Sequence, residues 1–159
     1  MGLLSKKNKP SQKAYAVVTG AGSGIGRSFA LELAKRGGDV ICADIELSSA
    51  QETVDLIQSM TSSSAYAVHC DVGLKESVHA LAEQAEQLLG HPVTLLINNA
   101  GVGLGGKFDE VSLEDWQWCM HVNLWGVIHG CHYFVPKFKQ QGFGAIINVA
   151  SAAGYTAAP

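Results

Sequence analysis

The sequence lacks the features expected of a membrane, secreted or nucleic-acid-binding protein. None of its apolar runs approaches the ~20 residues that a membrane helix needs. Residues 1–13 carry lysines but no apolar core of a signal peptide. Over 159 residues, 11 basic and 14 acidic side chains give a formal net charge of −3, too small to favour nucleic acid. We therefore expect a cytoplasmic protein, with a frayed basic arm at residues 1–13, that binds neither membranes nor nucleic acids.

Cysteine pairs with the spacing of a metal site are also missing. The four cysteines, which include no CxxC pair, are Cys42, Cys70, Cys119 and Cys131. We expect reduced thiols that pack as small apolar side chains, and no metal site. Four of the six histidines invite an acid–base role but have no visible partner: His69, His121, His129 and His132. For these side chains we favour packing in the core or at the surface.

What the sequence does contain is a regular alternation of β-rich and helix-like runs. Short apolar runs predict buried strands at residues 14–19, 40–43, 65–70, 93–97 and 145–150. Apolar residues at helical spacing predict helices at residues 24–36, 48–60, 74–89 and 112–140. Such alternation predicts an α/β fold, with a parallel sheet covered by helices on both faces and ligands bound at the carboxyl ends of the strands.

Several residues mark expected helix ends and contacts. Ser48 is expected to cap the second helix, and Ser112 and Asp115 have the spacing of a capping box for the last one. Pro136 is a candidate break or kink in that last helix. Its three tryptophans are expected to pack it against its neighbours or against a second subunit: Trp116, Trp118 and Trp125.

The first predicted strand runs into a turn with four glycines in seven residues. It reads Thr19-Gly20-Ala21-Gly22-Ser23-Gly24-Ile25-Gly26, which fits TGxxxGxG rather than the common GxGxxG. Glycines allow positive φ and let a diphosphate approach the backbone, while the helix that begins here offers free N–H groups. A tight turn that binds nothing is the alternative, but it would not need so many glycines. The turn therefore predicts a dinucleotide site.

Asp44 lies at the end of the second predicted strand, 24 residues after Gly20. A carboxylate there can accept hydrogen bonds from both ribose hydroxyls of adenosine, and it would repel a 2′-phosphate. The next residues, Ile45 and Glu46, are not basic, and neither is Ser23 in the turn. The sequence therefore predicts NAD rather than NADP. The alternative is that Asp44 only caps the following helix.

Five landmarks in chain order resemble the short-chain dehydrogenase/reductase family, in its single-domain branch. They are the TGxxxGxG turn, the pair Asp71-Val72, the segment Asn98-Asn99-Ala100-Gly101, Asn123 and Ser151. The resemblance implies an NAD-binding domain over residues 14–159. It implies a Rossmann-type doubly wound parallel sheet that contains strands one to five of the family's seven.

The resemblance also assigns roles to single residues. Cofactor binding falls on Gly20, Ser23, Gly24, Ile25, Gly26, Asp44, Asp71, Val72, Asn99, Ala100 and Gly101. Catalysis falls on Ser151, which would hydrogen-bond the substrate oxygen, and on Asn123, which would hold a water of a proton relay. From the residues alone, simpler interpretations stay open. Asn98 and Asn99 suit a turn, Asn123 suits an exposed helix position, and Ser151 suits the end of a strand.

One part of the family pattern does not follow Ser151. The family's Tyr and Lys, in the pattern YxxxK, are expected beyond Pro159, because Tyr155 comes too early and Pro159 stands where the Lys belongs. We therefore expect a fragment that is inactive alone. The last predicted strand would form an apolar, unpaired edge, so we also expect the fragment to aggregate.

The resemblance implies an NAD-dependent oxidoreductase that acts on a small-molecule alcohol or ketone, as a homo-oligomer at full length. Leu104, Gly105, Gly106 and Tyr155 are candidate neighbours of the substrate. A naturally short protein that binds NAD without catalysis, or that senses redox state, is the alternative. A methyltransferase on a similar sheet is less favoured, because it explains neither Asn98-Asn99-Ala100-Gly101 nor Ser151.

Overall fold

The computed structural model describes residues 9–154 of the chain. Most of the predicted basic arm, and Tyr155, therefore lie outside the described residues. The described part contains a parallel sheet of five strands in the order β3-β2-β1-β4-β5. These strands are β1 (Tyr15–Thr19), β2 (Asp39–Asp44), β3 (Ala65–His69), β4 (Leu95–Asn98) and β5 (Ala145–Asn148). The reversal of strand order beside β1 confirms the doubly wound α/β fold predicted from the sequence.

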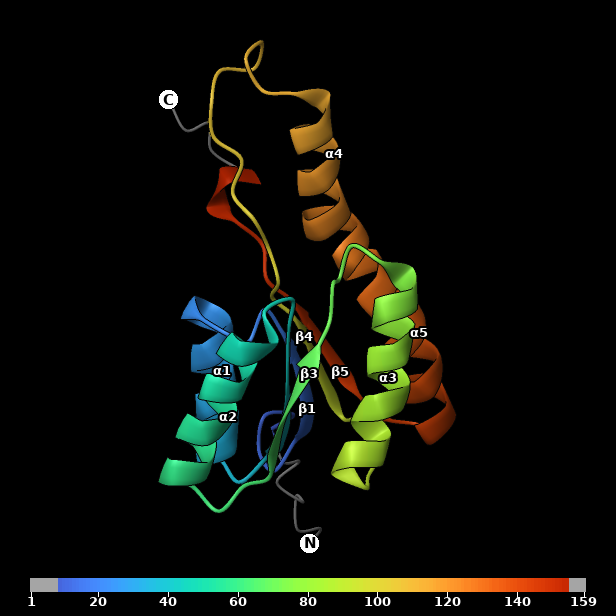
Figure 1. The fold of residues 1–159 in the computed structure, drawn as a ribbon. Helices are drawn as coiled ribbons and strands as arrows, with labels where there is room; N and C mark the ends of the chain where they lie inside the picture. The colour runs from blue at the N-terminus through green and yellow to red at the C-terminus, as the bar shows by residue number, and fades with distance from the viewer. Residues whose placement is uncertain (1–8, 155–159) are drawn as a thin grey trace, which may run out of the picture.

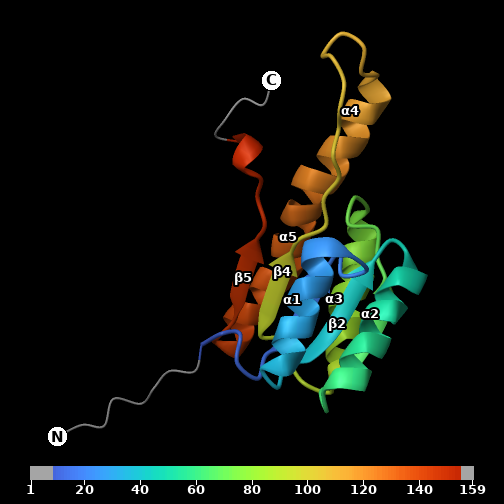
Figure 2. The same cartoon turned by 90° about the vertical axis from the view of Figure 1, so that its left-hand side faces the viewer.

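Helices cover both faces of this sheet (Figure 1). Two of them, α1 (Gly24–Lys35) and α2 (Leu47–Met60), pack together on one face. The other two, α3 (Lys75–Leu89) and α5 (Gly126–Gln141), pack together on the opposite face, as the turned view in Figure 2 also shows. None of the helices in residues 9–154 is long and apolar enough to cross a membrane.

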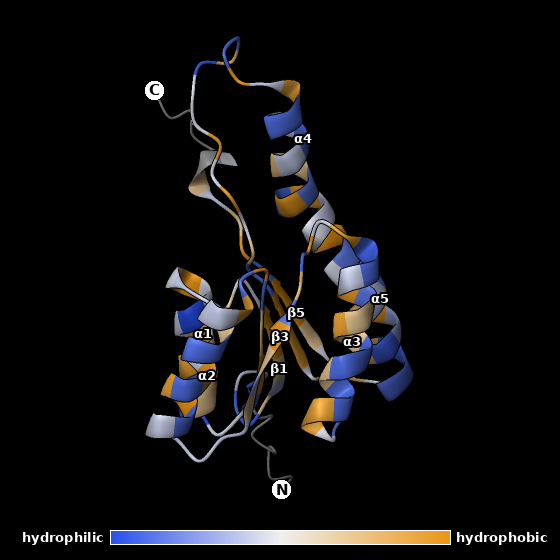
Figure 3. Ribbon diagram, in the orientation of Figure 1, coloured by the Kyte–Doolittle hydropathy of each residue, from blue (hydrophilic) through white to orange (hydrophobic). Residues whose placement is uncertain are grey.

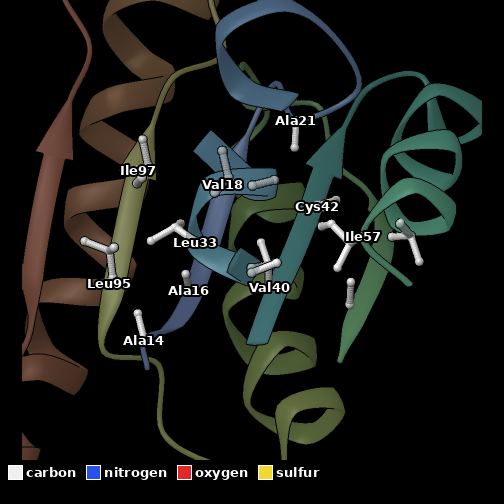
Figure 4. Packing of buried hydrophobic residues seen from close by; sticks show 14 of the residues in the cluster. Ala14, Ala16, Val18, Ala21, Leu33, Val40, Cys42, Ile57, Leu95 and Ile97 are labelled. Carbon is white, nitrogen blue, oxygen red and sulfur yellow. The ribbon is translucent and has the colours of Figure 1, made fainter. Parts of the chain in front are cut away.

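The strands are apolar on both sides because both sides are buried. Val18 pairs with Cys42 of β2 and Ile97 of β4, and these three side chains belong to the cluster against α1 and α2 (Figure 4). Their neighbours Val17 and Leu96 belong to the opposite cluster, under α3 and α5. Figure 3 shows the apolar strands between helices that have one polar face. Burial of each aliphatic side chain of this size contributes about 1.5–3 kcal/mol to the free energy of folding.

The second helix begins earlier than predicted. Its N-cap is Glu46, whose carbonyl accepts the N–H of Ala50, so Ser48 lies inside the helix and the predicted cap was wrong. The reason is the carboxylate of Asp44, which accepts the N–H of Glu46 at 3.0 Å and closes the turn directly after β2.

The long helix predicted for residues 112–140 is three consecutive pieces. The first is α4 (Leu113–Met120), with Ser112 as its N-cap accepting the N–H of Asp115. A π-helical turn, η1 (His121–Trp125), follows and leads into α5. Pro136 lies inside α5, which continues through it from Gly126 to Gln141. The irregularity is thus at η1, and the expected break at Pro136 was wrong.

Beyond the carboxyl ends of the strands, α4 projects away from the sheet (Figure 1). β5 lies at one end of the described sheet, and Ile147 is 42% exposed, whereas Leu96 of β4 is fully buried. On the α3 side, Lys137 of α5 forms ion pairs with Glu83 at 3.0 Å and Glu86 at 2.8 Å. These pairs hold α5 against α3.

Candidate functional site

A cavity of about 430 Å³ lies at the carboxyl ends of β1, β2, β3 and β4. Its walls contain all eleven residues that the sequence predicted for cofactor binding, from Gly20 to Gly101. The residues not predicted for it are Ile45, Cys70, Val102, Trp118 and Val122. Five segments far apart in the sequence thus converge on one hollow, at the place where doubly wound sheets bind ligands. What each residue binds there stays a prediction.

The turn after β1 has the backbone geometry for which its glycines were singled out. Gly20 and Gly24 have φ angles of +65° and +53°, which disfavour any side chain. A Cβ at Gly26 would collide with the carbonyl oxygen of Gly20, so α1 can cross the strand this closely only with glycine there. The turn is held to β2 by the N–H of Ala21, which donates to the carbonyl of Ala43 at 3.1 Å.

The beginning of α1 suits an anion. The N–H groups of a helix's first turn have no partners within the helix. Within the described part of the chain, Ser23 at the N-cap makes no capping hydrogen bond, and the first turn holds no acidic residue. Ser23, Gly24, Ile25 and Gly26 all line the cavity. The backbone donors and the positive end of the helix dipole therefore fit a diphosphate.

Asp44 holds the glycine turn as well as lining the cavity. Its Oδ2 accepts the N–H of Gly22 at 2.7 Å, and its Oδ1 accepts the N–H of Glu46 at 3.0 Å. The capping alternative is thus partly right, since Glu46 is the N-cap of α2. An ionised carboxylate has about four acceptor positions, so two bonds leave capacity for ribose hydroxyls.

Two residues that sequence reasoning missed brace the same turn. Arg27 of α1 donates through Nε to the hydroxyl of Thr53 at 3.0 Å, and through Nη2 to Glu52 and to the carbonyl of Gly22. Thr53 is fully buried in α2, and its hydroxyl donates to the carbonyl of Ala21 at 2.8 Å. The sequence feature that could have pointed to this contact is Thr53 itself, a polar residue among the buried positions of α2.

The segment after β4 is tied to β1 through Thr19. The hydroxyl of Thr19 accepts the N–H groups of Asn99 at 3.0 Å and Ala100 at 3.1 Å. The side chain of Asn99 donates to the carbonyl of Thr19 at 2.9 Å. Asn98 is buried and donates to Asn148 of β5 at 2.8 Å. The two asparagines therefore join β4 to β1 and to β5, so their side chains do more than form the turn that the residues alone suggested.

Asn123 lies in the π-helical turn, which the N–H of Gly126 closes on the carbonyl of His121. The Asn123 side chain binds the backbone of Val102 twice, accepting its N–H at 2.8 Å and donating to its carbonyl at 2.9 Å. π-Helical turns often occur at functional sites. The side chain fixes the segment that follows β4, and the predicted role in a proton relay stays a prediction.

The helix that continues from η1, α5, contacts the turn after β3. His129 Nδ1 lies 2.9 Å from the carbonyl oxygen of Val72. A Cβ at Gly126 would come within 2.8 Å of the Val72 side chain, so only glycine allows this close packing. Asp71 accepts the N–H of Gly73 at 2.9 Å, which shapes the turn.

Ser151 follows β5 and is exposed. Its carbonyl accepts the N–H of Gly154 at 3.1 Å, across the short 3₁₀ turn η2 (Ala152–Gly154). Neither Ser151 nor Asn123 lines the 430 Å³ cavity. The structure thus brings the predicted cofactor residues together in one hollow, and it leaves the two predicted catalytic residues outside its walls.

A YxxxK spacing that sequence reasoning overlooked occurs earlier in the chain, at Tyr133 and Lys137. In the structure Tyr133 stacks on His79 of α3, and Lys137 pairs with Glu83 and Glu86. Neither residue lines the cavity. Both side chains therefore join α5 to α3. The contacts of Tyr133 and Lys137 in this YxxxK spacing are packing contacts between helices.

Thiol chemistry in the cavity is disfavoured by burial. The four cysteines are free, and burial raises the pKa of Cys42 to about 12. Burial, followed by the nearby charges of Asp71 and Asp44, raises the pKa of Cys70 to about 11. Cys70 lines the cavity but stays protonated at neutral pH, so it is a poor nucleophile. The described residues contain no cluster of three potential metal ligands.

Comparisons with known proteins agree on one family. The family model described as short chain dehydrogenase matches residues 14–159. Cyclohexanol dehydrogenase of an Acinetobacter species is 41% identical over 148 residues, which cover 92% of this chain and 58% of that protein. The 7alpha-hydroxysteroid dehydrogenase of Escherichia coli is 34% identical over 138 residues, which cover 87% of this chain and 53% of that protein.

A solved structure extends the agreement to the fold. A short chain dehydrogenase/reductase from Burkholderia phymatum, crystallised in complex with NAD, superposes with a TM-score of 0.89 and 39% identity. The match covers 95% of this chain and 53% of that one, so the chain spans little more than half the length of these relatives. Since sequence, sheet order and glycine turn all agree, the chain belongs to the short-chain dehydrogenase/reductase family.

Proposed function

We propose that this chain forms the NAD-binding part of an oxidoreductase that acts on an alcohol or a ketone. The observation that carries the proposal is the convergence of the eleven predicted cofactor residues on one cavity at the start of α1. The names of two relatives, a cyclohexanol dehydrogenase and a hydroxysteroid dehydrogenase, support an alcohol or ketone as the substrate class. The NAD complex of the Burkholderia phymatum protein supports the cofactor.

Each wall of the cavity has a proposed task. The first-turn N–H groups of α1 bind the diphosphate, and the glycine turn lets it approach. Asp44 accepts the hydroxyls of the adenosine ribose and disfavours a 2′-phosphate, so NAD is preferred to NADP. Asp71 and Val72 border the adenine. Asn99, Ala100 and Gly101 border the rest of the adenosine side, held there by Thr19.

On the substrate side, NAD supplies or accepts a hydride when it is bound. Ser151 hydrogen-bonds the substrate oxygen and orients it. Asn123 serves the proton relay while its side chain keeps the Val102 segment in place. No YxxxK follows Ser151 within these 159 residues, so we assign the proton donor to none of them.

A titration of the full-length protein with NADH tests the proposal directly. We expect saturable binding, seen as a change in NADH fluorescence, and weaker binding of NADPH. No complex at millimolar NADH would overturn the proposal. Binding without oxidation of any of a panel of cyclic and steroid alcohols would favour a non-catalytic NAD-binding protein.

We also propose that the full-length protein is a cytoplasmic homo-oligomer. All four cysteines are free, which suits a reducing compartment. Leu124 and Trp125 lie exposed along η1, a surface suited to a second subunit. Sedimentation of the full-length protein tests this, and a strictly monomeric species at micromolar concentration would contradict it.

A further inference from the structure

The three tryptophans of the α4–η1 segment have different surroundings, which sequence patterns alone do not distinguish. Trp116 tilts against Phe108, with ring centroids 5.5 Å apart, and Trp125 tilts against His129 at 5.8 Å. Both line a separate surface hollow. Among the described residues Trp118 has no aromatic ring against it, and it lines the 430 Å³ cavity instead.

Trp118 is placed at the adenosine end of that cavity. It lies one helical turn before Val122, and both line the cavity together with Ile45, Asp71 and Val72. Ile45 directly follows Asp44 in the chain, and Asp71 and Val72 are the residues proposed above to border the adenine. A dinucleotide with its diphosphate at α1 and its ribose at Asp44 would therefore extend its base toward Ile45 and Trp118.

A second hollow adjoins the cavity at this point. It has a volume of about 400 Å³ and shares Ile45, Asp71, Trp118 and Val122 with the cavity. Trp118 thus stands in the common wall of the two hollows. Trp118 is 49% exposed as a residue, so part of its surface is accessible to a ligand.

We propose that Trp118 stacks on the adenine of the dinucleotide and is a binding residue of the cofactor site. The inference rests on the function proposed above. An indole offers a flat face that matches a purine, and stacking needs no hydrogen bond to the base. Ile45 and Val122 lie beside it and complete an apolar slot.

The test compares Trp118→Ala with Trp116→Ala in the full-length protein. Trp116 is a matched control, because it is on the same helix, is partly exposed and does not line the cavity. Loss of one base–aromatic stack is expected to weaken NADH binding about tenfold in Trp118→Ala. Trp116→Ala is expected to bind NADH like the unchanged protein.

Ligand fragments separate stacking from a general loss of structure. Trp118→Ala is expected to lose affinity for AMP and ADP-ribose about as much as for NADH, and to keep its affinity for NMNH, which has no adenine. AMP is also expected to quench tryptophan fluorescence in the unchanged protein and not in Trp118→Phe. This second readout decides the question even if the alanine variant fails to fold.

The two proposals fail in different ways. If the unchanged protein does not bind NADH, the proposed function and this inference both fall. If it binds NADH and Trp118→Ala binds NADH and AMP equally well, only the role of Trp118 is refuted. An equal loss of affinity for NMNH in Trp118→Ala would also refute stacking on adenine.

Discussion

Replacing Asp44 by Asn separates the two tasks of this carboxylate. The amide keeps the size of the side chain and one acceptor oxygen. It can therefore still accept the N–H of Gly22, which lies 2.7 Å from Asp44 Oδ2 in the unchanged protein. Its NH₂ group would then face the N–H of Glu46, whose hydrogen bond is lost. The negative charge next to the proposed ribose site disappears. The variant should therefore retain the glycine turn and change the choice of cofactor.

The magnitudes follow from the bonds involved. A hydrogen bond to a charged group contributes about 1.5–3 kcal/mol, so NADH binding should weaken about tenfold to a hundredfold in Asp44→Asn. Removal of the carboxylate relieves repulsion of a 2′-phosphate, so NADPH binding should improve or stay level. Loss of the exposed hydrogen bond to the Glu46 N–H should lower the free energy of unfolding by about 0.5–1.5 kcal/mol, because water can take the place of the lost acceptor.

Fluorescence titration with NADH and NADPH measures the two dissociation constants, and urea unfolding measures stability. Glu46→Gln is the matched control. Glu46 is exposed and lies two residues after Asp44, so this variant removes one nearby negative charge and leaves the Asp44 carboxylate in place. An unchanged ratio of NADH to NADPH affinity in Asp44→Asn would refute the assigned role of Asp44. A shifted ratio in Glu46→Gln would show that general charge, and not this carboxylate, selects the cofactor.

Three further changes test the packing beneath the site. Gly26→Ala places a Cβ against the Gly20 carbonyl and should cost about 1–3 kcal/mol or more in urea unfolding, whereas an unchanged midpoint would contradict the close crossing. Thr19→Val leaves two backbone N–H groups without an acceptor and should cost about 1–3 kcal/mol each, measured in the same way. Lys137 lowers the pKa of the Glu83 carboxyl by hydrogen bonding and charge, so this contribution exists above the ordinary carboxyl pKa and is lost as the pH falls. The stability advantage over Lys137→Met should therefore shrink on acidification, and a constant difference from neutral to acidic pH would refute it.

The sequence predicted the sheet and the cavity walls well because both follow from local patterns. Val17 and Val18 face opposite clusters, which is why their strand reads as a continuous apolar run. The residues predicted for cofactor binding lie where strands end, and parallel strands bring all their carboxyl ends to one edge. Glycine at position 26 was informative because only glycine permits the crossing.

What the sequence did not predict depends on contacts between distant segments. The π-helical turn coincides with Gly126 packing on Val72, a contact over many residues that no local pattern encodes. Thr53 looked like one polar position on a helix until α2 was placed over the glycine turn. Trp118 was indistinguishable from Trp116 until the direction of α4 was known.

The contacts of the η1–α5 segment make it a shared support for both sides of the cavity mouth. Asn123 grips the strand exit at Val102, and six residues later His129 reaches the exit at Val72. A tilt of this one helix would therefore move the segments that follow β3 and β4 together.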